Sequence, residues 1–291
     1  MSPVDETSTF PFVIRGRRTQ NVADNIFDHL DAKTLTKCRI VSKHWKEQVD
    51  CRTRHWARVS TWCYINAAEG GQLEICRLII KKVANKNPKS HSGNTPLHYA
   101  SGKGHLDICQ MIIDRVEEKN PGNIYGKTPL HWAAQNGQLE VCSLILAKVK
   151  DQNPADDWGT TPLHESARHG YVDICHFILT QCSIEDRNPA DEDGVTPLHN
   201  AAKNGHTDIC KIIMDNVENK NPSDRCGITP LHKAAEFGRI EVCSLLMANI
   251  EDRHPRSSHG VRGVQLTPLD LAKKNGHNDV AQLIQDWRNK N

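Results

Sequence analysis

The sequence predicts an all-α repeat protein, a solenoid of stacked helix-turn-helix units. The first observation is that Thr-Pro-Leu-His occurs five times, beginning at Thr95, Thr128, Thr161, Thr196 and Thr229. The second is that these copies, and a sixth copy Thr-Pro-Leu-Asp at Thr267, start 33, 33, 35, 33 and 38 residues apart. A recurring period of this length is the signature of a repeat array. Two short helices cannot bury their apolar faces alone, so the units must stack.

Local signals within one copy predict its two helices. Thr128 is a good N-cap, and Pro129 suits the first helical position because an N–H is not needed there. Gly137 is expected to end this helix. An apolar stripe at helical spacing then predicts a second helix, formed by Leu139, Cys142, Ile145, Leu146 and Val149. Asn153-Pro154 is expected to end it, since a residue before proline avoids the helical conformation.

The period divides residues 62–291 into about seven units. The first unit, 62–94, is degenerate because Trp62-Cys63-Tyr64-Ile65 replaces the tetrapeptide, and the last unit, 267–291, is polar enough to act as a cap. The units between them are 95–127, 128–160, 161–195, 196–228 and 229–266. The sequence assigns no role to the basic loop 256–263.

The Thr-Pro-Leu-His-x-Ala pattern at a period of 33 resembles the ankyrin repeat. The resemblance implies that β-hairpin fingers connect the helix pairs, and that fingers and inner helices line a groove that binds other proteins. It places these residues in the groove: Tyr99, Tyr125, Trp132, Trp158, Glu165, Asn200 and Lys233. Tyr125, Trp132 and Trp158 would form an aromatic cluster suited to a binding hot spot, the alternative being scattered surface aromatics.

Residues 21–58 do not follow the repeat, and residues 1–20 before them are expected to be disordered. Two short amphipathic helices are predicted, the second with Leu35, Cys38, Val41, Trp45 and Val49 along one face. One interpretation is a helical cap that covers the first repeat, which every array needs in some form.

The same stretch resembles an F-box. The resemblance is carried by Asn25-Ile26-Phe27-Asp28-His29-Leu30-Asp31, then Leu35, and then Val41-Ser42-Lys43-His44-Trp45. The usual Leu-Pro opening of the motif is replaced by Val22-Ala23. An F-box implies docking onto the Skp-type adaptor of a cullin-RING ubiquitin ligase, here through Ile26, Phe27, Leu30, Leu35, Val41 and Trp45.

Two ladders of equivalent residues invite a chemical interpretation. Cysteines recur on the second helix, at Cys76, Cys109, Cys142, Cys175, Cys210 and Cys243. Stacked helices lie about 8–10 Å apart, too far for a disulfide or a shared zinc ion, so we interpret these cysteines as small buried hydrophobes. By resemblance to ankyrin repeats, the recurring histidine binds its own threonine and the neighbouring loop.

Two strings approach catalytic motifs and fail on spacing. Gly122–Thr128 is one residue short of a phosphate-binding loop, which leaves Lys127 as a variable finger residue. His164-Glu165-Ser166-Ala167-Arg168-His169 has its second histidine at i+5, on a different helix face from a metalloprotease pair. The sequence therefore predicts neither an enzyme nor a cofactor or metal site.

The composition and charge of the chain limit the partners and the cellular compartment that we expect. Lys and Arg total 37 against 35 Asp and Glu, which argues against a nucleic-acid binder. The chain has no apolar run long enough to span a membrane and no secretion signal at its start, so we expect a cytoplasmic or nuclear protein that is monomeric outside its complex. The leading hypothesis is a substrate-recognition subunit of a cullin-RING ligase. The alternative is an ankyrin scaffold with a helical N-terminal cap and no role in ubiquitin transfer.

Overall fold

The computed structural model describes residues 53–250, 255–257 and 265–290, and these ranges form 14 helices and no strand. The inner helices are α3 (Thr53–Glu69), α5 (Pro96–Lys103), α7 (Pro129–Gln135), α9 (Pro162–His169), α11 (Pro197–Asn204), α13 (Pro230–Glu236) and α15 (Pro268–Lys274). The outer helices are α4 (Leu73–Lys82), α6 (Leu106–Ile113), α8 (Leu139–Leu146), α10 (Val172–Gln181), α12 (Thr207–Asp215), α14 (Ile240–Asn249) and α16 (Asn278–Lys290). The predicted all-α repeat solenoid is confirmed. The predicted segment 1–20 and most of the module 21–58 lie outside the described residues.

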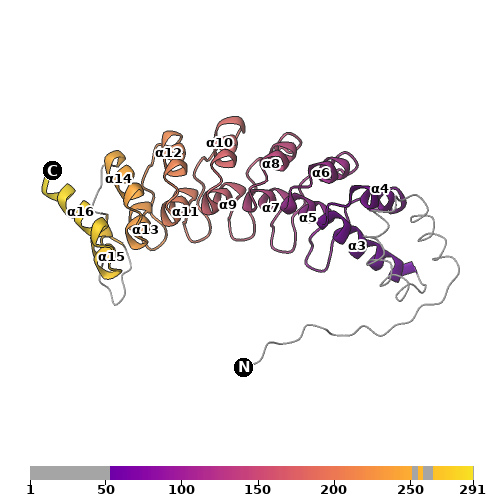
Figure 1. The fold of residues 1–291 in the computed structure, drawn as a ribbon, viewed down its shortest axis with the longest axis horizontal. Helices are drawn as coiled ribbons and strands as arrows, with labels where there is room; N and C mark the ends of the chain where they lie inside the picture. The colour runs from indigo at the N-terminus through magenta and orange to yellow at the C-terminus, as the bar shows by residue number, and fades with distance from the viewer. Residues whose placement is uncertain (1–52, 251–254, 258–264, 291) are drawn as a thin grey trace, which may run out of the picture.

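The helix pairs follow one another along a curved row (Figure 1). The inner helices lie side by side along the middle of the row, and the outer helices lie on its convex side. The connecting fingers extend from the opposite side of the inner helices. The fingers and the inner helices therefore share one continuous face.

The first inner helix departs from the predicted unit boundary. Helix α3 begins at Thr53, well before Trp62, and so passes through the predicted gap between the N-terminal module and the array. The other inner helices begin with proline directly after a threonine N-cap. Proline keeps the preceding residue out of the helical conformation and thereby sets the start. Unit 1 lacks this proline, so its helix is free to extend towards the N-terminus.

Each recurring histidine bridges two units. In the unit that begins at Thr95, the backbone N–H of Thr95 donates to His98 Nδ1 at 3.1 Å. Nδ1 is therefore an acceptor, and His98 Nε2–H donates to the carbonyl of Lys127 at 3.0 Å, just before the next threonine. The bridge from Nε2 recurs in four further units, from His131 to Thr160, His164 to Val195, His199 to Ile228 and His232 to Leu266. The predicted structural role of these histidines is confirmed.

A second set of contacts joins the units at the other end of the inner helices. His105 Nε2 lies 2.9 Å from the carbonyl of Glu69, and His277 Nε2 lies 3.1 Å from the carbonyl of Glu236. Each histidine directly precedes the outer helix of its own unit and contacts the carbonyl of the last residue of the inner helix in the preceding unit. The carbonyls at a helix C-terminus lack partners within the helix, so a donor from the next unit satisfies them. The inner helices are thus linked at both ends.

The Asn-Pro pair does not end the outer helix, contrary to the prediction. Helix α8 ends at Leu146, where the chain turns through a bond from Lys148 N–H to the carbonyl of Ile145. The asparagine instead acts on the following unit, because Asn153 Oδ1 accepts the backbone N–H of Leu163 at 3.1 Å. This N–H belongs to the first turn of α9 and has no partner within the helix. The same bond is made by Asn87, Asn120 and Asn188.

The fingers are minimal hairpins. In the finger at residues 123–127, Asn123 N–H donates to the carbonyl of Lys127, and Gly126 N–H donates to the carbonyl of Asn123. This is a three-residue hairpin turn whose last position needs a positive φ, which Gly126 supplies with φ 70°. Successive fingers also bond to each other, for example from Asp157 N–H to the carbonyl of Tyr125 at 3.1 Å. The finger tips are therefore held in register.

The six equivalent cysteines are buried in the core, as the sequence predicts. The side chains of Cys76, Cys109, Cys142, Cys175, Cys210 and Cys243 are 0% exposed. Burial raises the pKa of the thiols, to about 12 at Cys109 and Cys175. Each thiol thus remains protonated and packs as a small apolar group.

The asparagine bond offers a matched stability test. Asn153→Ala removes the acceptor of a buried N–H and should lower the free energy of unfolding by about 1 kcal/mol. Asn221 occupies the same position one unit before Leu231, but its buried Oδ1 has no hydrogen-bond partner among the described residues. Asn221→Ala should therefore change stability much less. Urea unfolding of both variants checks this, and equal losses would contradict the assigned role.

The histidine bridges predict sensitivity to acid. Burial lowers the pKa of His98 and His199 to about 4, and lowers the pKa of His131 and His164 as well. The unfolded chain binds these protons near pH 6.5 while the folded chain does not. Stability is therefore full above about pH 6.5 and falls as the pH drops towards 4, by about 1.4 kcal/mol per pH unit for each histidine. Urea midpoints measured from pH 7.5 to 4.5 test this, and a flat profile would refute it.

Candidate functional site

An aromatic pair lies on neighbouring finger tips in the middle of the array. The rings of Tyr125 and Trp158 stack with their centroids 5.6 Å apart and their planes 26° from parallel. About half of each side chain is exposed, 48% for Tyr125 and 49% for Trp158. The backbone bond from Asp157 N–H to the carbonyl of Tyr125 holds the two tips together. The pair is therefore a preformed apolar surface rather than two independent side chains.

A second aromatic pair lies on the inner helices. The rings of Tyr99, on α5, and Trp132, on α7, meet edge to face with centroids 5.3 Å apart. Trp132 also meets the His98 ring edge to face at 5.8 Å. Trp132 was predicted to cluster with Tyr125 and Trp158, whereas the ring contacts of the structure are Tyr99–Trp132 and Tyr125–Trp158. Equivalent positions in successive units lie side by side, so each aromatic residue contacts its counterpart in the next unit.

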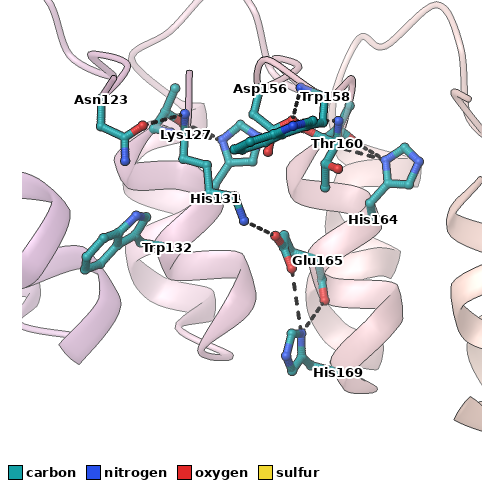
Figure 2. Close-up of polar contacts among 12 residues, drawn as sticks. Asn123, Lys127, His131, Trp132, Asp156, Trp158, Thr160, His164, Glu165 and His169 are labelled. Carbon is teal, nitrogen blue, oxygen red and sulfur yellow. Dashed lines mark hydrogen bonds and ion pairs between the residues drawn. The ribbon is translucent and has the colours of Figure 1, made fainter. Parts of the chain in front are cut away.

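Glu165 is buried below this face. The side chain is 1% exposed, and its Oε1 accepts from Lys127 Nζ at 2.7 Å (Figure 2). Lys127 comes from the finger that carries Tyr125 and spans the distance to α9 with its long side chain. His169, one turn further along α9, places its Nδ1 2.9 Å from the carbonyl of Glu165 and 4.0 Å from Oε2. Glu165 is thus the acidic centre of a small charged cluster.

The carboxyl of Glu165 is ionised. Burial by itself would raise its pKa, but the hydrogen bond and charge of Lys127, with a smaller effect from Arg168, hold the pKa below its usual value. Oε2 is buried and has no hydrogen-bond partner among the described residues. The cluster is therefore compensated in charge but retains one unused acceptor.

The remaining two predicted groove residues differ in exposure. Asn200, which occupies the position of Glu165 one unit later, is 6% exposed, and its buried Nδ2 finds no hydrogen-bond partner within the described part of the chain. Lys233 is partly exposed and lies 3.4 Å from Glu236 Oε2 on the same helix. Of the seven predicted groove residues, only Tyr125 and Trp158 lie in the exposed class, and Glu165 and Asn200 are buried.

The role of Lys127 is not evident from the sequence. Lys127 and the Glu165–His169 string resemble two separate failed motifs there, whereas the structure joins them in one cluster (Figure 2). The sequence contains one signal for this cluster. Glu165 directly follows a histidine that is expected to be buried, and a carboxylate close to the core requires a cationic partner. One whole unit, 128–160, lies between Lys127 and Glu165 in the sequence, so no helix spacing connects them.

The face is suited to binding. In the described ranges, no three His, Cys, Asp or Glu side chains are close enough to hold a metal ion. Within the same ranges, no helix has the length and apolar character needed to cross a membrane. Exposed aromatic side chains on a rigid, hydrogen-bonded framework are typical anchors of protein interfaces. The fold and this face define a repeat protein that binds other proteins.

Comparisons with known proteins agree. A family model of ankyrin repeats matches residues 63–123, 115–188, 181–256 and 218–291, and the chain belongs to the ankyrin-repeat family. A model of the F-box domain matches residues 20–56, which confirms the predicted N-terminal F-box. A search of curated proteins found no match. Both matched families are protein-interaction modules.

A double-mutant cycle tests the buried ion pair. Lys127→Gln leaves the Glu165 carboxylate buried and uncompensated, so it should cost about 2 kcal/mol of stability. The cycle with Glu165→Gln should give a coupling energy above about 1 kcal/mol. The same cycle at Lys233 and Glu236, whose side chains are 26% and 35% exposed, is the control and should give less than about 0.5 kcal/mol. Equal coupling in the two cycles would contradict the assignment.

Proposed function

We propose that this protein is a substrate-recognition subunit of a cullin-RING ubiquitin ligase. The N-terminal F-box binds a Skp-type adaptor, and the ankyrin face binds a target protein. The observation that carries the proposal is the joint presence of both modules in one chain, at 20–56 and 63–291. The protein performs no chemistry itself, and it acts in the cytoplasm or nucleus.

The mechanism is simultaneous binding. A target held on the array is kept close to the ligase, and the transfer of ubiquitin then proceeds at a high effective concentration. A rigid array suits this role, because its units are joined at both ends of the inner helices and by the register of the fingers. A rigid connection loses less of the effective concentration than a flexible one.

The adaptor contacts are proposed from the motif. The apolar positions Ile26, Phe27, Leu30, Leu35, Val41 and Trp45 carry the contact, and all of them lie outside the described residues. Helix α3 begins at Thr53, inside the matched F-box range, and continues into the first unit. The target contacts are proposed for the face that carries Tyr125 and Trp158.

The alternative is an ankyrin scaffold whose N-terminal helices only cap the first unit. The ankyrin repeats at 63–291 support this function by themselves, because repeat arrays bind proteins through their extended concave surfaces. The two functions differ in one property, which is binding to the adaptor.

An adaptor pull-down with the full-length protein separates them. The intact chain should retain a purified Skp-type adaptor, and Leu30→Glu combined with Trp45→Ala should abolish retention, because a charge and a cavity replace two apolar contacts. The matched control makes the same changes in the array, as Leu106→Glu with Trp158→Ala at two exposed positions, and should retain the adaptor. Failure of the intact chain to bind would exclude the ligase function.

A further inference from the structure

Acidic residues flank the exposed aromatic pair. In the register of the finger tips, Asp157 bonds to the tip of Tyr125, and Glu192 N–H donates to the carbonyl of Trp158 at 2.9 Å. Asp193 follows on the same tip as Glu192, and the side chains of all three acidic residues are exposed. Two acidic tips are therefore continuous with the stacked rings of Tyr125 and Trp158.

These carboxylates have no counter-charge in ion-pair contact within the described part of the chain. Within the described residues, none of Asp157, Glu192 and Asp193 forms an ion pair. Lys127 is the cation of the Tyr125 finger, and Glu165 already neutralises it at 2.7 Å. The acidic stretch ends at the next tip, where Arg225 N–H donates to the carbonyl of Asp193. The surface around the aromatic pair is thus negative, although the whole chain has a net charge of +2.

Glu165 gives an independent indication of a cationic ligand. Its side chain is 99% buried, being 1% exposed, and its Oε2 has no hydrogen-bond partner among the described residues. Figure 2 shows the carboxylate between Lys127 and His169. A buried acceptor without a donor carries an unmet desolvation cost, which a donor from a bound molecule would relieve. Lys127 and His169 cover it, and their own side chains are 27% and 37% exposed.

We propose that this face binds a basic segment of the target, an extended stretch with lysine or arginine side chains. One cationic side chain lies on the exposed rings of Tyr125 and Trp158, beside the carboxylates of Asp157, Glu192 and Asp193. A second donates to Glu165 Oε2 on the inner helices. The proposal rests on the proposed function, and it adds the chemistry by which a target is recognised.

The chemistry of the face favours a cation over other ligands. A lysine or arginine over an aromatic face is attracted by the ring, and the attraction strengthens when neighbouring carboxylates are present. An acidic segment would be repelled by three uncompensated carboxylates. A purely apolar segment would exclude water from those carboxylates without offering them a hydrogen-bond donor or a counter-ion. Desolvation of a carboxylate without such a partner costs free energy.

The test is a binding titration with the full-length protein and a defined probe. The probe is a fluorescein-labelled 12-residue Gly-Ser peptide that contains four lysines or arginines, with binding followed by anisotropy. Two further peptides replace these residues by citrulline or by glutamate. The basic peptide should bind, and the citrulline and glutamate peptides should bind at least about tenfold more weakly.

Variants locate the site. Trp158→Ala should weaken binding of the basic peptide about threefold, through loss of the ring contact. Glu192→Lys with Asp193→Lys should weaken it about tenfold or more. The matched control is Glu117→Lys with Glu118→Lys, an adjacent exposed pair that follows outer helix α6 and changes the net charge equally. The control should change binding less than about twofold, and circular dichroism establishes that each variant is folded.

Three outcomes overturn the proposal. The first is equal binding of the basic and citrulline peptides, and the second is equal weakening by the control pair. The third is binding that appears only after Arg15, Arg17 and Arg18 are replaced by alanine, which would make the chain's own basic segment the occupant. Adaptor retention measured on the same preparation separates this inference from the ligase function, since either can fail while the other holds.

Discussion

The structure depends on a neutral histidine that is shared between neighbouring units. An imidazole has two chemically different nitrogens, so one ring can accept from its own threonine at Nδ1 and donate to the next unit at Nε2. Both bonds are made in a buried setting, where unpaired backbone groups would be costly. The bridge therefore sets the distance and orientation between consecutive inner helices. It also requires that the ring remain uncharged, and burial of His98 lowers its pKa to about 4 accordingly.

Several other features follow from this repeated bridge. Once the inner helices stand at a fixed distance, the asparagine of one unit reaches the free N–H of the next helix, and the finger tips bond to each other in register. Backbone hydrogen bonds and a few recurring side chains satisfy the polar groups of the helices and fingers. Residues at the finger tips and after the histidine are left free to vary. This separation of framework from surface explains how Tyr125, Trp158 and the acidic tips can form a specific face without disturbing the fold.

The buried pair of Lys127 and Glu165 shows where that separation fails. Glu165 occupies a position that the framework does not specify, yet the position is closed to water. A charge placed there needs a partner, and a lysine from a finger supplies it at 2.7 Å. The pair removes one positive charge from the face and so shapes its electrostatic character. Together with the F-box at 20–56, the ankyrin repeats give the chain two separate protein-interaction modules.

The repeat, the helix starts at each Thr-Pro pair, the buried cysteines and the bridging role of histidine could be predicted from the sequence, because they recur at a fixed period and each follows from local chemistry. The start of α3 at Thr53 could not, because its unit has no Thr-Pro pair. The roles of Asn153 and Lys127 could not, since each acts on a residue of another unit at a distance that only the stack defines. The same reason explains the aromatic residues. Their positions on fingers and helices were predictable, but the pairing of Tyr125 with Trp158 and of Tyr99 with Trp132 depends on which units lie side by side. Local order is encoded along the chain, whereas contacts between units exist only after stacking.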